Sequence, residues 1–379
     1  MKAGHLWIYA GEIARVDEGV AAGDPIEVAD ARGRFLGRGY YNPFSTITVR
    51  LLTRRRDERI DAALVRRRIA EAVAYRRRFY PAGESCRLIA SEGDWLPGLT
   101  VDRYASWLVV QISTLGMERL RDLVVAALID AVHPRGIYER SDLPVRAREG
   151  SPGRVGLLHG EVPEVAEIEI DNLRFAVDLH AGQKTGMYLD HRFNRRAVMS
   201  HASGRRVLDV FCNSGAFALY ALHGEATAAT GIDWSPPALG LARRNADLNG
   251  VADRCRWIEG NAFDHLKALD SSGERFDLIV LDPPAFTKSA SALAAARRGY
   301  KEINLRALRL AAPGAVLLTA SCSYHMPPES FADTVREAAA DAGREVSVIE
   351  ARGQAPDHAV NLGVPETRYL KCLLLAVRA

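Results

Sequence analysis

VLDVFCNSGAF, residues 207–217, sets the architecture of the second half of this 379-residue chain. An apolar run that carries Asp209 passes into a turn containing Gly215 and then into apolar residues at helical spacing. A strand, a tight turn and a helix in this order are typical of an open α/β sheet, in which a ligand at the carboxyl end of the strand meets backbone N–H groups and a carboxylate. The turn lacks the three glycines of GxGxxG, which disfavours a dinucleotide with a diphosphate bridge.

The sequence beyond about residue 180 repeats this alternation. Apolar strands separated by helical sequence are expected over residues 205–211, 227–234, 255–260, 276–284 and 315–321. One helix is sharply marked over 236–249, because Ser235 can cap it, Pro236 suits its first turn and Gly250 follows its end. Apolar strands separated by helices predict a doubly wound sheet.

The first half of the chain contains two smaller modules. Short strands broken by glycine turns predict a small β-barrel and are expected over residues 25–30, 31–42 and 45–53. A connecting helix is expected over 60–80, and residues 86–170 mix strand and helix patterns as a small α+β module does. The predicted domains are 1–70, 71–170 and 171–379.

Composition indicates a cytoplasmic protein. No apolar run approaches the roughly 20 residues that span a bilayer, and the first residues lack the apolar segment of a signal peptide. The five cysteines never occur as CxxC or beside histidines at ligand spacing, which supports neither a disulfide framework nor a metal site. They are Cys86, Cys212, Cys255, Cys322 and Cys372.

The net charge of +3 is unevenly distributed, because residues 1–80 hold 16 Lys and Arg against 10 Asp and Glu. Much of this excess is arginine, in the runs TRRRDER (53–59), VRRRIA (65–70) and YRRRFY (75–80). The planar donor fork of arginine suits phosphates, so contact with RNA is one interpretation. A solvated helix face is the other.

Polar residues at the ends of the next two strands indicate the ligand. Asp233 ends the second strand, 18 residues after Gly215, where such sheets place an acid on ribose hydroxyls. Asn261 follows the third strand, from where an amide can bond the edge of an adenine ring. A nucleoside with a free ribose and no diphosphate points to S-adenosylmethionine as the cofactor. Acids at strand ends also cap helices without binding a ligand, but three such residues in order favour a site.

The fourth and fifth predicted strands are each followed by a candidate catalytic residue. Two prolines stiffen the chain after Asp282, and with Phe286 they form a wall that suits a planar, amino-bearing base flipped out of its stack. Cys322 follows the apolar run of the fifth strand and is interpreted as a nucleophile, the alternative being a packing residue. Cys212, in the turn of the opening stretch, is interpreted as packing.

These residues resemble the RlmI/RlmO-like 23S ribosomal RNA (cytosine-5) methyltransferases over nearly the whole chain. The resemblance rests on HLWIYAGEI (5–13), GLTVDRY (98–104), IYERSD (137–142), GQKTGMYLDHR (182–192), LDVFCNSGAF (208–217), LDPPAF (281–286), RRGYKEINLRAL (297–308), TASCSYHM (319–326) and PDH (356–358). It implies an α/β fold: a Rossmann-like class I methyltransferase domain preceded by a PUA-like RNA-binding β-barrel and a small α+β middle domain.

The resemblance also assigns residues. Asp282 and Cys322 fall on its two catalytic motifs. The predicted cofactor-binding residues are Lys184, Thr185, Asp209, Phe211, Asn213, Gly215, Asp233, Trp234, Asn261, Ala262 and Asp282. The predicted substrate-binding residues are Pro283, Pro284, Phe286 and His358, although a structural role for His358 is the favoured interpretation.

The implied reaction is methylation of carbon 5 of a cytosine in 23S ribosomal RNA or a large-subunit precursor, through a covalent adduct with Cys322. Ser321 and Ser323 are expected to donate hydrogen bonds to the thiolate. Ala285 stands where the wider group of RNA cytosine-5 methyltransferases has a second cysteine, so water or Asp282 is left to remove the carbon 5 proton. Asn261 replaces the aspartate of many relatives, and its amide oxygen can still accept from adenine.

Two other functions are compatible with the sequence. An N-methyltransferase acting on the exocyclic amine of an RNA base would use the same proline wall without needing a cysteine. A non-catalytic RNA-binding scaffold would keep the fold alone. A homodimer is compatible with the sequence, whereas membrane and metal partners are not expected.

Overall fold

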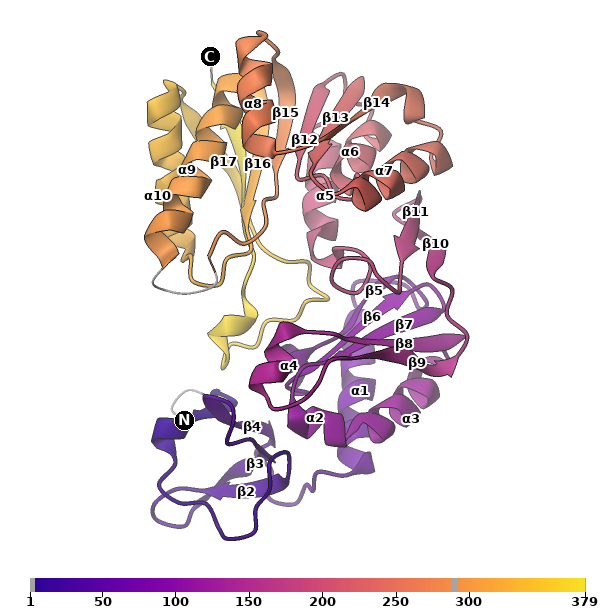
Figure 1. Cartoon of the computed structure of the whole chain (residues 1–379), viewed down its shortest axis with the longest axis vertical. Helices are drawn as coiled ribbons and strands as arrows, with labels where there is room; N and C mark the ends of the chain where they lie inside the picture. Colours follow the sequence, from indigo (N-terminus) through magenta and orange to yellow (C-terminus); the bar gives the residue numbers. More distant parts are fainter. Residues whose placement is uncertain (1–3, 288–291, 379) are drawn as a thin grey trace. The chain divides into compact units, whose positions relative to one another are not determined.

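The computed structural model describes residues 4–287 and 292–378, which form two compact units (Figure 1). The first unit comprises residues 4–168, 177–190 and 356–367. The second comprises residues 169–176, 191–355 and 368–378. The predicted barrel and middle module therefore belong to one unit, together with a short segment from near the carboxyl end. The domain boundaries at residues 70 and 170 stay predictions.

The first unit begins with a four-stranded antiparallel sheet in the order β1-β4-β3-β2. Its strands are β1 (Trp7–Tyr9), β2 (Pro25–Ala29), β3 (Phe35–Tyr41) and β4 (Ile47–Thr53). Three of the four were predicted, and β1 is the addition. Leu6, Ile8, Val49 and Leu51 form the buried core of this sheet, so the short β1 is held by packing as well as by pairing.

A five-stranded sheet follows, in the order β5-β6-β7-β8-β9. Its strands are β5 (Cys86–Ala90), β6 (Leu99–Tyr104), β7 (Trp107–Ile112), β8 (Gly136–Ser141) and β9 (Arg154–Gly160). The helices of this region are α1 (Ala62–Arg76), α2 (Leu115–Arg119), α3 (Arg121–Val132) and α4 (Pro144–Arg148). The carboxylate of Asp61 accepts from the Leu64 N–H at 3.0 Å and caps α1, which packs against α3.

The second unit is built on a seven-stranded sheet in the order β14-β13-β12-β15-β16-β18-β17. Its strands are β12 (Arg206–Val210), β13 (Ala228–Asp233), β14 (Cys255–Glu259), β15 (Phe276–Leu281), β16 (Ala311–Ser321), β17 (Val346–Arg352) and β18 (Lys371–Val377). The first five strands are parallel, and β18 runs antiparallel to its neighbours. The order reverses between β12 and β15, and such a switch point opens a crevice at the carboxyl ends of the strands.

Helices cover both faces of this sheet, so the predicted doubly wound arrangement is confirmed (Figure 1). On one face lie α5 (Arg192–Ser200), α6 (Ala216–His223) and α7 (Pro236–Leu248); on the other lie α8 (Ala262–Ser271), α9 (Leu293–Leu310) and α10 (Pro328–Ala342). The second group packs a continuous apolar core against β12, β15 and β16. Ser235, Pro236 and Gly250 mark the ends of α7 as predicted.

A hairpin of β10 (Val165–Ile170) and β11 (Leu173–Asp178) contributes its tip, residues 169–176, to the second unit. Its turn residue Asp171 accepts hydrogen bonds from Arg192, Arg196 and Tyr220, all within the second unit. These donors hold the pKa of the Asp171 carboxyl well below its ordinary value, although burial acts in the opposite direction. Across residues 4–287 and 292–378, no helix is long and apolar enough to cross a membrane.

Candidate active site

The turn after β12 has an unusual backbone. Phe211 and Asn213 adopt positive φ angles of 64° and 49°, and Gly215 adopts 76°. Side chains other than glycine rarely occupy this region, and such conformations cluster at ligand sites. At Gly215 a β-carbon would also lie 2.5 Å from the Trp257 ring, so only glycine fits. The strained turn places three predicted cofactor-binding residues at the switch point.

Asp209 lies inside the sheet, one residue before the end of β12, and its side chain is fully buried. Its Oδ2 accepts from the Ala218 N–H at 3.1 Å, whereas its Oδ1 is buried with no hydrogen-bond partner in the described part of the chain. Burial raises the pKa of Asp209 to about 7, and Asp282 and Asp233 act in the same direction. A buried carboxylate oxygen without a partner suits a cationic ligand group, and the methionine part of S-adenosylmethionine carries an ammonium.

Asp233, at the end of β13, is held in place by backbone N–H donors. Its carboxylate accepts from the Asn213 N–H at 2.8 Å and from the Ser235 N–H at 3.0 Å. Each carboxylate oxygen has a further lone pair, so the predicted contact with ribose hydroxyls fits this arrangement. The next residue, Trp234, is 72% exposed and leaves a large aromatic face open beside the acid.

Asn261 and Ala262 lie at the start of α8, after β14. The Asn261 side chain caps the helix, because its Oδ1 accepts from the Phe263 N–H at 2.9 Å. The amide oxygen that was predicted to face adenine therefore already holds one hydrogen bond. Ala262 is buried in the first turn of the helix. The adenine contacts of both residues stay predictions.

The segment after β15 carries Asp282 and the two prolines that were predicted to form a wall for the substrate base. The Asp282 N–H donates to Val210 O at 3.4 Å, while Pro283 is buried and Pro284 is exposed. The Phe286 ring packs 4.7 Å from the Tyr300 ring and 6.2 Å from the Phe263 ring, measured between centroids. Its predicted contact with a substrate base stays a prediction.

Cys322 follows the last residue of β16 and is half-buried. Its Sγ lies 4.0 Å from the carbonyl oxygen of Pro283, so the two predicted catalytic motifs meet at neighbouring strand ends. Ser321 and Ser323 are fully buried, and both hydroxyls bond the Tyr300 hydroxyl, at 2.8 Å for Ser323. Donation from these serines to the thiolate stays a prediction.

The other cysteines have environments that suppress reactivity. Burial raises the pKa of the thiols of Cys86, Cys212, Cys255 and Cys372. The packing role predicted for Cys212 fits its 5% exposure. In the described ranges, no three His, Cys, Asp or Glu side chains are grouped as a metal ion would require.

His191 was not among the predicted site residues, although it lies in the GQKTGMYLDHR motif. Its Nε2 is 3.2 Å from Asp282 Oδ1, and its Nδ1 is 3.1 Å from Asn194 Nδ2. The Asn194 amide is oriented by a donor, Arg352 Nε, on its oxygen and by an acceptor, Gly353 O, on its nitrogen. Asn194 therefore donates to Nδ1, which leaves the proton of a neutral His191 on Nε2, facing Asp282.

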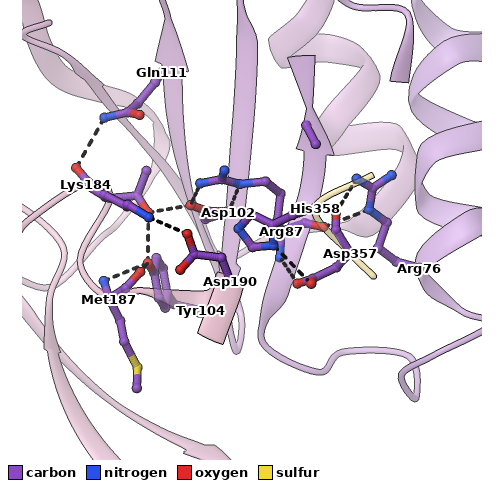
Figure 2. A network of polar contacts seen from close by, with 12 residues as sticks. Arg76, Arg87, Asp102, Tyr104, Gln111, Lys184, Met187, Asp190, Asp357 and His358 are labelled. Atoms are coloured by element: carbon purple, nitrogen blue, oxygen red, sulfur yellow. Dashed lines mark hydrogen bonds and ion pairs between the residues drawn. The ribbon is translucent and has the colours of Figure 1, made fainter. Parts of the chain in front are cut away.

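Three predicted site residues belong to the first unit, where a polar network holds them (Figure 2). Lys184 Nζ donates to Asp190 Oδ2 at 2.6 Å, and the buried Thr185 hydroxyl donates to Asp102 at 2.5 Å. His358 is buried, with Nδ1 3.1 Å from Asp357 Oδ1. These contacts fit the favoured structural interpretation of His358. The ligand contacts of all three stay predictions.

Many of the arginines in the basic runs are engaged within the chain. Arg67 and Arg68 on α1 pair with Glu71, and Arg76 forms a buried ion pair with Asp94. Their charges are partly compensated, so the runs are less basic on the surface than the sequence alone indicates. Contact between these runs and RNA stays a prediction.

Comparison with known families agrees with this geometry. A family model described as S-adenosylmethionine-dependent methyltransferase matches residues 120–368, and a PUA-like domain model matches residues 1–54. A solved structure described as a putative S-adenosylmethionine-dependent methyltransferase from Streptococcus mutans is 20% identical, with a TM-score of 0.85 over 99% of this chain and 96% of that one. The predicted fold class is thereby confirmed.

Curated relatives match over nearly the full length. Ribosomal RNA large subunit methyltransferase I of Tolumonas auensis is 42% identical over 376 residues, covering 98% of this chain and 95% of that protein. The protein of the same name from Aeromonas salmonicida is 42% identical over 378 residues, covering 99% and 96%. The chain therefore belongs to the family of S-adenosylmethionine-dependent methyltransferases, with S-adenosylmethionine as its cofactor, as the strand-end residues indicated.

Proposed function

We propose that this methyltransferase modifies carbon 5 of a cytosine in large-subunit (23S) ribosomal RNA through a covalent adduct with Cys322. The substrate is supported by relatives that are 42% identical and carry the name ribosomal RNA large subunit methyltransferase I. One observation carries the role of the cysteine: Cys322 Sγ lies 4.0 Å from Pro283 O, beside the wall expected to hold the base.

The chemistry explains why a thiol is needed. Carbon 5 of cytosine is a weak nucleophile, so the Cys322 thiolate first bonds to carbon 6 and the π pair of the 5,6 double bond moves towards ring nitrogen 3. S-adenosylmethionine supplies the methyl group as an electrophile. Carbon 5 then bonds to that methyl group, and the pair of the broken sulfur–methyl bond stays on the departing sulfide. Loss of the carbon 5 proton to a base restores the double bond and expels the Cys322 thiolate.

Asp282 is proposed to hold the base as charge develops on it. A carboxyl that is protonated, or that shares a proton with nitrogen 3, stabilises the ring while the adduct exists. His191 presents its Nε2 proton 3.2 Å from Asp282 Oδ1, so it limits the orientations open to that carboxylate. Either Asp282 or a water molecule removes the carbon 5 proton, since Ala285 offers no acid–base group.

The alternative N-methyltransferase needs no nucleophile, so Cys322→Ala separates the two reactions. We expect the variant to lose methyl transfer to large-subunit RNA from cells that lack the gene, with Cys255→Ala as a control that keeps it. The methylated nucleotide is then identified by mass spectrometry as 5-methylcytosine or as an N-methylated base. An active Cys322→Ala enzyme, or an N-methylated product, contradicts the proposal.

The remaining expectations are part of the same proposal. Family membership disfavours the non-catalytic scaffold, and a rise in melting temperature on adding S-adenosylmethionine provides a direct check. A cytoplasmic location, the form of the RNA substrate and a homodimer stay predictions.

A further inference from the structure

Lys371, the first residue of β18, lies beside the turn that carries Cys322. It pairs with Ser321 in the antiparallel register between β16 and β18. Its side chain is only 7% exposed, and its Nζ donates to Ser323 O at 2.6 Å and to Tyr369 O at 2.8 Å. The ammonium is therefore buried against the backbone that follows the proposed nucleophile.

This buried cation has no carboxylate partner within residues 4–287 and 292–378. Burial lowers the pKa of Lys371 to about 8, and a negative charge on Cys322 opposes that shift. Buried lysines are normally paired with an acid, because an isolated ammonium loses its hydration without compensation. The anion available to compensate Lys371 is the thiolate of Cys322.

Two groups near Cys322, Pro283 O and Asp282, favour the protonated thiol. The carbonyl oxygen of Pro283 faces Sγ at 4.0 Å, and Asp282, one residue earlier, adds negative charge when ionised. Tyr300, from α9, stays neutral because burial raises the pKa of its hydroxyl. A thiolate at this position therefore needs a cation, and β18 supplies one.

We propose that Lys371 is a positioning residue that maintains Cys322 as a thiolate. The inference rests on the proposed function, because it assigns a partner to the nucleophile of that reaction. The ammonium stabilises the anion electrostatically, and its hydrogen bond to Ser323 O fixes the turn in which the sulfur sits. A purely structural lysine would only bridge two carbonyl groups, for which an uncharged donor would serve as well.

The test measures the thiol itself, without RNA. The full-length protein is alkylated with iodoacetamide across a pH series, and mass spectrometry follows Cys322, with the half-buried Cys255 as internal reference. We expect Cys322 to titrate below the ordinary thiol pKa of about 8.5. Lys371→Met should raise that value by about one unit and slow alkylation at pH 7 about tenfold. Lys371→Arg should preserve it, and so should the surface control Lys267→Met.

Several results overturn the inference. If Cys322 in the wild-type protein titrates at or above the ordinary thiol pKa, the inference is refuted. This measurement needs no variant, so it holds even if Lys371→Met fails to fold. An unchanged thiol pKa in folded Lys371→Met, or equal preservation by Lys371→Gln, assigns the lysine a structural role. These outcomes can be told apart from failure of the proposed function. An active Cys322→Ala enzyme refutes the covalent reaction. If Cys322→Ala is inactive but the Cys322 pKa is unchanged in Lys371→Met, only this inference is refuted.

Discussion

Replacing Asp209 with Asn tests whether the Asp209 carboxylate, which is predicted to bind the cofactor, is held in the folded protein at a cost in stability. Its ordinary pKa of 3.8 rises to about 7 on burial, so the folded protein keeps a proton that the unfolded chain has lost. Between pH 4 and pH 7 the folded state therefore binds more protons, and stability falls as pH rises. About three pKa units at 1.4 kcal/mol each make this loss about 4 kcal/mol, complete above pH 7.

Asn keeps the oxygen that accepts from the Ala218 N–H but carries no charge, so Asp209→Asn should not show this loss. Relative to wild type, the variant should become more stable by up to about 4 kcal/mol between pH 4.5 and pH 8 without ligand. Hydrogen exchange of peptides from β12 and α6 measures the opening free energy of this unit alone.

Asp264→Asn, on the exposed surface of α8, is the matched control and should follow wild type at every pH. Parallel pH profiles for Asp209→Asn and wild type would show that the Asp209 carboxylate is not destabilising in the folded protein. A steeper fall in the variant than in wild type would reverse the sign of the argument. Either result removes the reason for linking Asp209 to a cationic ligand.

Two further substitutions test the geometry of the site. In urea unfolding, Gly215→Ala should destabilise the protein by about 2–3 kcal/mol, because φ is 76° and the new methyl would meet Trp257. The control Gly240→Ala, in an open position of α7, should be neutral or stabilising. His191→Leu should slow single-turnover methyl transfer about tenfold by releasing Asp282, and His191→Gln should restore much of the rate by offering an N–H donor. Equal rates for the Leu and Gln variants would contradict the proposed donor role.

The central strands of the second unit were predictable because β12, β15 and β16 are mostly buried and largely apolar. β9 is not marked by its sequence, because it is an edge strand whose residues are half-buried or exposed. The three-residue β1 was missed because so short a segment shows no periodicity. Local pattern identifies a strand only when packing constrains most of its side chains.

The same reasoning explains which site residues were predictable. Asp209, Asp233 and Asp282 were found because each lies at the end of an apolar strand, and parallel strands bring their carboxyl ends together. His191 and Lys371 were not, because they approach from elements far along the chain. The signal for Lys371 was a lysine directly before the apolar run CLLLAV, but a charge at the start of a strand is usually solvated, and only the register with β16 buries it.

Asp209 and Lys371 share a property that folding alone does not explain. Each is a buried ionisable group with a pKa shifted towards neutrality, and no ion pair joins either side chain to an opposite charge in the described ranges, although Arg195 lowers the pKa of Asp209. Unpaired buried charge lowers stability, so its presence at the edge of a well-packed sheet calls for a compensating gain elsewhere. We propose that in both cases the compensating charge comes from the reaction: a cationic cofactor group for Asp209 and a thiolate for Lys371. On this proposal, Asp209 and Lys371 are destabilising in the free protein because each is placed to meet a charge that is present only during the reaction.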